Sequence, residues 1–170
     1  MAESAQQGSE LAGELRVRRA TRTDAELLWR WANDAAVRAN AFRREPIPVD
    51  VHVRWLEAHL ADVGSRIWVL ERGSVPVGQV RYERLAGVAE VDISIAPEER
   101  GHGYGVELLL RTTPLACAEL GVLRLVALVL PENAPSLRAF ARAGYVVVGR
   151  EERHGQTAER FERRCTGPRP

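Results

Sequence analysis

Apolar and polar residues alternate along several short stretches of the chain, and this alternation predicts β-strands. The stretches are 15–19, 67–70, 77–82 and 88–96, and turn residues at 72–76 and 85–87 separate the last three. Strands joined by short turns pair most simply as antiparallel neighbours. The pattern therefore predicts one strand near the start of the chain and an antiparallel meander in its middle.

Apolar residues spaced three or four apart predict four helices. The first helix follows a capping-box pattern at Thr23–Glu26, and the other three follow Asp50, Gly105 and Asn133. The four helices are expected to end near residues 33, 62, 120 and 144. Pro114 lies inside the third helix and is expected to kink or break it, because proline has no N–H to donate. Residues 35–48 are expected to form a long irregular connection.

Residues 122–130 are apolar throughout and predict a strand buried on both faces, parallel to the strand at 88–96. Residues 145–149 predict a penultimate strand, and 157–164 is expected to pair as a closing edge strand. The fold class is thus α/β (α+β), with a mixed, mostly antiparallel sheet, one parallel pair and about four flanking helices. The 170 residues fit one domain at 13–165, between polar tails at 1–12 and 166–170 that are expected to be disordered.

The charged residues nearly balance, which excludes a protein that binds its partners through a strong overall electrostatic field. The chain has 24 arginines, no lysine and 23 acidic residues, which gives a net charge of +1. No nucleic-acid partner is expected from this balance. No stretch reaches the roughly 18 apolar residues of a membrane span, and the N-terminus lacks a signal-peptide pattern. Cys117 and Cys165 are far apart and are expected to stay unlinked and bind no metal, so we expect a soluble, cytoplasmic protein.

A glycine-rich turn follows the strand at 88–96 and precedes the third helix. It reads Arg-Gly-His-Gly-Tyr-Gly from Arg100 to Gly105. Glycine lets a ligand approach the backbone, and N–H groups at a helix N-terminus attract phosphate. The turn lacks the Lys-Ser/Thr ending of a P-loop and the glycine spacing of a dinucleotide-binding motif. The remaining pattern, Arg-x-x-Gly-x-Gly, suits a pyrophosphate.

A second motif surrounds the fourth helix, where Asn133 and Ser136 are followed by Phe140 and then by Gly144-Tyr145. In this order the two motifs resemble the signatures of the GCN5-related N-acetyltransferase (GNAT) superfamily, and the resemblance covers about residues 14–165. It implies that the two parallel strands splay apart and that the pantetheine arm of acetyl-CoA, the co-substrate, lies in the opening. The cofactor-binding residues it implies are Ile93, Ser94, Ile95, Arg100, Gly101, His102, Gly103, Tyr104, Gly105, Asn133, Ser136 and Phe140.

The reaction implied is direct attack of a primary amine on an acyl thioester, which needs a base more than an acid. Removing a proton at pH 7 from an amine of pKa near 10.4 costs about 4.6 kcal/mol, whereas expelling a thiolate of pKa near 8.5 costs about 2. Glu90 and Asp92 alternate onto one face of their strand, so either carboxylate can take the proton. Phe140 stands where family members often place a tyrosine acid, which puts assisted thiolate departure in doubt.

The segment between residues 29 and 55 is similar, more loosely, to the nucleotide-linked amino-sugar N-acetyltransferases that acetylate the 4-amine of a UDP-sugar on the way to pseudaminic acid. The substrate-binding residues implied are Trp31, Asn33, Arg38, Phe42, His52 and Trp55. Aromatic rings can stack on sugar or uracil, and Arg38, Arg43 or Arg44 can hold a diphosphate. A small-molecule amine, first of all a nucleotide-linked 4-amino-6-deoxy sugar, is therefore the expected acceptor.

Two other functions stay open. A protein N-terminal acetyltransferase of the ribosomal-modification type also carries a Trp-x-Asn-Asp-like helix end, as in Trp31-Ala-Asn-Asp34. A non-catalytic acyl-CoA-binding module is compatible with Phe140. Thiol release with a good acceptor distinguishes an enzyme from such a module. A homodimer is compatible with each of these functions.

Overall fold

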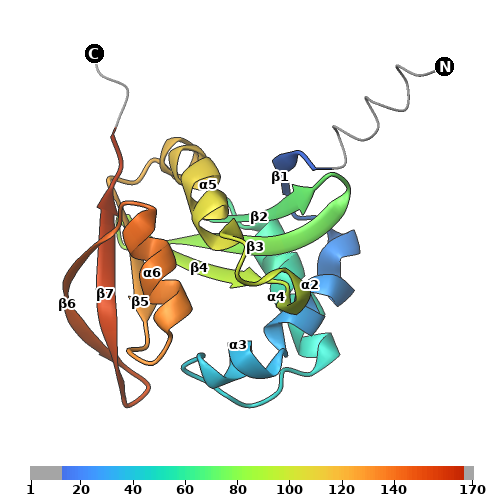
Figure 1. Ribbon diagram of the computed structural model, residues 1–170, viewed down its shortest axis with the longest axis horizontal. Helices are drawn as coiled ribbons and strands as arrows, with labels where there is room; N and C mark the ends of the chain where they lie inside the picture. Colours follow the sequence, from blue (N-terminus) through green and yellow to red (C-terminus); the bar gives the residue numbers. More distant parts are fainter. Residues whose placement is uncertain (1–12, 167–170) are drawn as a thin grey trace.

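The computed structural model describes residues 13–166, which fold into a central sheet with helices packed against it (Figure 1). The strands are β1 (Leu15–Arg19), β2 (Ser65–Arg72), β3 (Val75–Leu85), β4 (Val88–Ile95), β5 (Arg124–Val129), β6 (Val146–Arg153) and β7 (Gln156–Arg164). The helices are α2 (Ala25–Ala32), α3 (Ala35–Ala39), α4 (Val49–Ala61), α5 (Tyr104–Leu120) and α6 (Ala134–Arg142), with short 3-10 turns η1 (Arg22–Asp24) and η2 (Pro97–Glu99).

Seven strands form one sheet in the order β1-β2-β3-β4-β5-β7-β6. Among the strands of residues 13–166, only β4 and β5 are parallel, which confirms the expected mixed sheet with one parallel pair. The expected place of the last strand is wrong, because β7 lies between β5 and β6 and leaves β6 at the edge. This highly charged strand tolerates an inner position because Ala158 and Phe161 are buried and its charged side chains pair with those of its neighbours, as Glu159 does with Arg150.

Apolar side chains cover both faces of the sheet. Trp68 and Leu70 of β2 belong to the larger cluster, which includes Leu108 and Leu109 of α5. Ile67 and Val69 alternate with them and join a second cluster with Leu28 of α2 and Leu56 of α4. Because successive strand residues point to opposite faces, α5 lies on one side of β2, and α2 and α4 lie on the other.

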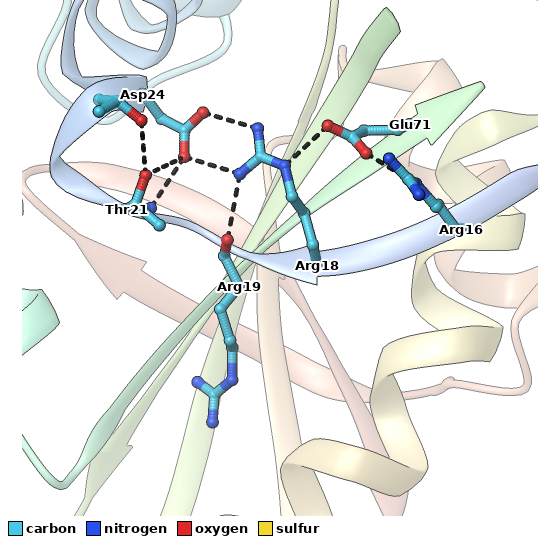
Figure 2. A network of polar contacts seen from close by, with 7 residues as sticks. Arg16, Arg18, Arg19, Thr21, Asp24 and Glu71 are labelled. Carbon is cyan, nitrogen blue, oxygen red and sulfur yellow. Dashed lines mark hydrogen bonds and ion pairs between the residues drawn. The ribbon is translucent and has the colours of Figure 1, made fainter. Parts of the chain in front are cut away.

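A polar network joins β1 to β2 and to the turn before α2 (Figure 2). Arg18 donates from both Nη atoms to the Asp24 carboxylate at 2.8 Å and from Nε to Glu71 Oε1 at 2.7 Å. Both carboxylates are buried. Burial favours their neutral forms, yet Arg18 outweighs it and holds the pKa of Asp24 and of Glu71 below the usual range.

Three details of the first helices differ from expectation. The capping box consists of Thr21 and Asp24 instead of Thr23 and Glu26, because Asp24 turns inward to Arg18. Within 35–48, five residues form α3, a helix too short to produce a periodic pattern. α4 starts at Val49, so Asp50 lies in its first turn and does not cap it.

α5 runs through Pro114 without interruption, so the expected break is absent from this helix. Proline removes the partner of the Leu110 carbonyl. Leu110 and Pro114 are both exposed, and water can therefore hydrogen-bond to the freed carbonyl.

β4 and β5 pair over only two positions, Ala89 with Leu125 and Glu90 with Val126. Beyond Glu90, β5 continues its ladder with β7, and the edge of β4 that faces β5 is left open. The splayed parallel pair implied by the family resemblance is thus present in the described residues.

The cysteines correct a further expectation. Cys117 at the end of α5 and Cys165 after β7 form a disulfide with a Cα–Cα distance of 5.5 Å, across a sequence separation of 48. The expectation of a reduced compartment, which depended on unlinked cysteines, loses that basis. Within residues 13–166, none of the helices has both the length and the apolar character needed to cross a membrane.

Candidate active site

A cavity of about 530 Å³ opens where β4 and β5 part. Residues 91–95 of β4 form one wall, and residues between 99 and 106 form the rim at the start of α5. The walls are completed by α6 and by residues between 36 and 41, in and just after α3. The glycine-rich turn, the Asn133 motif and part of the 29–55 segment therefore meet at one cavity.

Gly101 and Gly103 keep the backbone of the glycine-rich turn open. Their φ angles of 83° and 80° lie in the left-handed region, and a Cβ added to either would have no other atom within 4 Å. Gly103 is the N-cap of α5, so the turn leads directly into the free N–H groups of a helix N-terminus. Arg100, Gly101, Gly103, Tyr104 and Gly105 line the cavity. His102 lies outside the lining and stacks on Tyr104, with ring centroids 5.7 Å apart.

Two arginines of α6 also line the cavity and were missed by the sequence motifs. Arg138 and Arg142 are one helical turn apart and pair with no acidic side chain of the described residues. Their i, i+4 spacing, next to Ser136, was a signal that both lie on one helix face. Asn133 caps α6 by accepting from the N–H of Ser136 at 3.3 Å, and both residues line the cavity.

The two candidate bases have different surroundings. Asp92 lines the cavity together with Ile93, Ser94 and Ile95. Glu90 lies outside the lining, where its Oε1 accepts from Arg153 Nη1 at 2.5 Å. Of the two carboxylates, Asp92 is thus the one placed to meet a ligand.

The pKa of Asp92 lies above its usual range. The surrounding protein disfavours the charged form and Glu90 adds to this effect, whereas Arg81 and Arg38 favour the charge. The residue is still exposed, because its side chain faces the open cavity. A reachable carboxylate whose pKa is raised toward neutral is a better proton acceptor than an ordinary aspartate.

Phe140 lines the cavity and packs edge-on against Tyr145, with ring centroids 5.1 Å apart. The Tyr145 hydroxyl bonds to Thr113 Oγ1 at 3.0 Å inside the core, where burial raises its pKa. Tyr145 is therefore not available as an acid at the cavity, whereas Tyr104 lines it.

Arg38 is the candidate acceptor residue that lines the cavity. Its Nη1 donates to the Arg43 carbonyl at 3.1 Å, and its buried Nε has no partner among the described residues. Burial lowers the pKa of Arg38, against the pull of Asp92 and Glu45. The guanidinium thus keeps an unused donor near the cavity.

Asn33 and Phe42 hold the segment after α3 in place and lie outside the cavity lining. The Asn33 amide exchanges hydrogen bonds with the backbone of Ile47, at 2.7 and 3.1 Å. The Phe42 carbonyl accepts from Gln156 Nε2 at 2.9 Å. Arg44 also reaches this side of the molecule, 3.6 Å from Glu132.

Trp31, His52 and Trp55 are not brought to the cavity. Trp31 of α2 is 6% exposed and His52 of α4 is 3% exposed, so both side chains are buried. Trp55 lies between His52 and His59, at centroid distances of 5.2 and 4.4 Å. Burial lowers the pKa of His52, whose Nδ1 has no partner among the described residues.

The acetyltransferase (GNAT) domain family matches residues 14–146. An N-acetyltransferase 9-like protein from Nematostella vectensis is 34% identical over 76 residues, which are 44% of this chain and 38% of that protein. The matched part is thus less than half of that relative's length.

Solved structures share the fold over nearly the whole chain. A spermidine N-acetyltransferase from Vibrio cholerae, in complex with CoA and spermine, has a TM-score of 0.77 at 23% identity, covering 88% of this chain and 95% of that one. A putative acetyltransferase from Salmonella typhimurium with acetyl-CoA reaches 0.76 at 19%, covering 92% and 97%. An aminoglycoside acetyltransferase in complex with coenzyme A reaches 0.75 at 17%, covering 89% and 95%.

Proposed function

Because the chain belongs to the GNAT acetyltransferase family, we propose that it transfers an acetyl group from acetyl-CoA to a primary amine. The observation that carries the proposal is that Asp92 and the open glycine-rich turn line the same cavity. In this proposal the turn binds the pyrophosphate of the donor, and Asp92 takes the proton of the attacking amine.

The residues around the turn fit acetyl-CoA. Space is free where a Cβ would stand at Gly101 and Gly103, so phosphate oxygens can reach the backbone N–H groups. Arg138 and Arg142 add positive charge at the same cavity. The open edge of β4 beyond Glu90 offers backbone groups to the pantetheine amides. When bound, acetyl-CoA supplies the thioester carbonyl that the amine attacks.

Asp92 meets the main energetic demand of the reaction. Freeing the lone pair of an amine as basic as a lysine side chain, with a pKa near 10.4, costs about 4.6 kcal/mol at pH 7. Asp92 can take this proton directly or through one water. Glu90, held by Arg153, lies close enough to Asp92 to help raise the pKa of Asp92. A dedicated acid is unnecessary, because thiolate departure costs only about 2 kcal/mol.

The acceptor in this proposal is a nucleotide-linked 4-amino-6-deoxy sugar. Four arginines line the cavity, Arg38, Arg100, Arg138 and Arg142, against two carboxylates, Asp92 and Glu99. Arg100, Arg138 and Arg142 face the phosphates of the donor in this proposal, so Arg38 is the cation left to favour an acceptor that carries phosphates over a polycation such as spermine or an aminoglycoside. Arg38 lines the cavity, and its guanidinium supplies a positive charge for a diphosphate. Support for the sugar thus comes from Arg38, since Trp31, His52 and Trp55 lie outside the lining.

The acceptor is tested by measuring free CoA thiol with UDP- and dTDP-linked amino sugars, aminoglycosides, spermidine and N-terminal peptides. A UDP-linked 4-amino sugar should have the highest kcat/KM. Arg38→Ala should lower this value about tenfold or more through a raised KM, as expected for a lost charged hydrogen bond. Arg43→Ala, which removes an exposed neighbouring charge outside the lining, is the control and should change it less than twofold.

Other results of this assay would support one of the alternative functions or contradict the choice of acceptor. If a peptide is turned over best, the chain is a protein N-terminal acetyltransferase. If a polycation is turned over best, the charge argument is wrong. If acetyl-CoA binds and no amine releases thiol, the domain is a binding module.

A further inference from the structure

Arg100 of the glycine-rich turn forms an ion pair that spans the cavity rim. Its Nη2 donates to Oδ1 of Asp34, which lies between α2 and α3. Burial favours the neutral form of Asp34, yet Arg100 and the N–H groups of Val37 and Ala36 outweigh it and lower the pKa of Asp34 below its usual range. The side of the cavity where we place the pyrophosphate is thereby connected to the side where we place the acceptor.

α3 has few other ties to the rest of the molecule. It buries none of its five residues, although Ala36, Val37 and Arg38 line the cavity. Asp34 caps the helix by accepting from Ala36 and Val37 at 3.1 and 3.2 Å. Because apolar burial does not fix α3, its position depends on polar contacts such as the one with Arg100.

The Asp34–Arg100 pair can separate at low cost. Asp34 Oδ1 keeps two backbone N–H donors when Arg100 leaves, so no acceptor is left without a partner. Ion pairs that are open to solvent are weak, and the side chains of Arg100 and Asp34 are 38% and 19% exposed. A pyrophosphate carries more negative charge than one carboxylate and binds a guanidinium strongly.

We propose that Asp34 and the donor's pyrophosphate compete for the Arg100 guanidinium, so that donor binding releases α3 on the acceptor side of the cavity. Asp34 is then a positioning residue that couples the two substrates. The inference rests on the proposed function for the identity of the donor.

The competition is tested by calorimetric titration of the protein with CoA. Asp34→Asn keeps a good N-cap and removes the competing charge, so CoA should bind about threefold more tightly. In an Arg100→Ala background the same substitution should have no effect. Glu99→Gln removes another carboxylate from the cavity lining, one held by Arg72 at 2.8 Å, and its effect should be the same with or without Arg100. Unchanged or weaker CoA binding by Asp34→Asn, or equal tightening in both backgrounds, overturns the proposal.

Hydrogen exchange without ligand tests the release of α3 separately. Arg100→Ala removes a side chain outside α3, yet the amides of residues 37–40 should exchange several-fold faster than in the wild type. Asp34→Asn should show the same increase. Unchanged exchange in both variants contradicts the role of the pair, whatever the donor is. If CoA does not bind the wild type at all, the proposed function fails, whereas the exchange result still decides whether Arg100 holds α3.

Discussion

Asp92 and Glu90 are two residues apart on one strand face, and their contacts give them different roles. We expect Asp92→Asn to lower kcat about 100-fold at pH 7, because the amide cannot take a proton. The loss should shrink at pH 9, where more of the amine is already free. In the wild type, kcat should fall as the pH drops through the raised pKa of Asp92, and this acid limb should be missing in Asp92→Asn.

Glu90→Gln is the matched control for this measurement. It removes the partner of Arg153 and leaves the cavity lining intact, so its loss of rate should be smaller and should keep the acid limb. An equal loss for Asp92→Asn at both pH values would mean that Asp92 positions the amine and is not its base.

The sequence identified Glu90 and Asp92 as candidate bases but did not show which of the two is the base. Strand alternation puts Glu90 and Asp92 on one face. The choice depends on Arg153, which is 63 residues away and reaches Glu90 only because β6 and β7 fold back beside β5. Arg38 was predicted with Trp31 and His52 as one group, but helical periodicity alone does not show which side chains α2 and α4 bury.

The glycine-rich turn that begins α5 is the element on which donor binding depends in the proposed function. Gly103→Val adds a branched side chain where φ is 80° and where phosphate is expected, so CoA affinity should fall at least 100-fold in calorimetry. Gly87→Val is the control, because its φ of 84° and its empty surroundings are the same while it lies in the β3–β4 turn. If both variants lose CoA equally, or neither does, the turn is not the pyrophosphate site.

The network of Figure 2 predicts how firmly β1 and α2 are held. Asp24→Asn removes a buried negative charge that pairs with the half-buried Arg18 and should destabilise the fold by about 3 kcal/mol. For a chain of this length the melting temperature should drop by about 9 °C. Glu26→Gln, which removes an exposed i, i+4 pair with Arg30, should change it by about 1 °C or less. Equal drops would show that Asp24 contributes no more than a surface charge.

The predicted elements were correct where periodicity is strong and wrong where partners are distant. Strong alternation and apolar runs located β1 to β5, and Gly121 and Asn133 marked helix ends correctly. The inner position of β7 was missed because its sequence, with few apolar residues, resembles an edge strand. Its charges are satisfied by Arg124, Arg150 and Glu151 on neighbouring strands, and no local pattern contains that information.

For the whole molecule, the disulfide joins the end of α5 to the end of β7. Removing a cross-link over 48 residues should cost about 2–4 kcal/mol, because the unfolded chain regains freedom. We expect reductant to lower the melting temperature by about 10 °C in calorimetry. The Cys117→Ser/Cys165→Ser double variant should melt at the lower temperature with or without reductant. A wild-type melting temperature that does not respond, while both thiols become titratable, contradicts this role.

The central claim is that the cavity between β4 and β5 catalyses acetyl transfer to an amine. Its most direct test is the release of CoA thiol from acetyl-CoA at pH 7, with and without a UDP-linked 4-amino sugar, followed by mass measurement of the sugar. We predict release that requires the acceptor, one N-acetyl group per thiol, and a rate that falls about 100-fold in Asp92→Asn. Tight CoA binding with no release above the acceptor-free rate, for the sugar and for every other amine supplied, would contradict it.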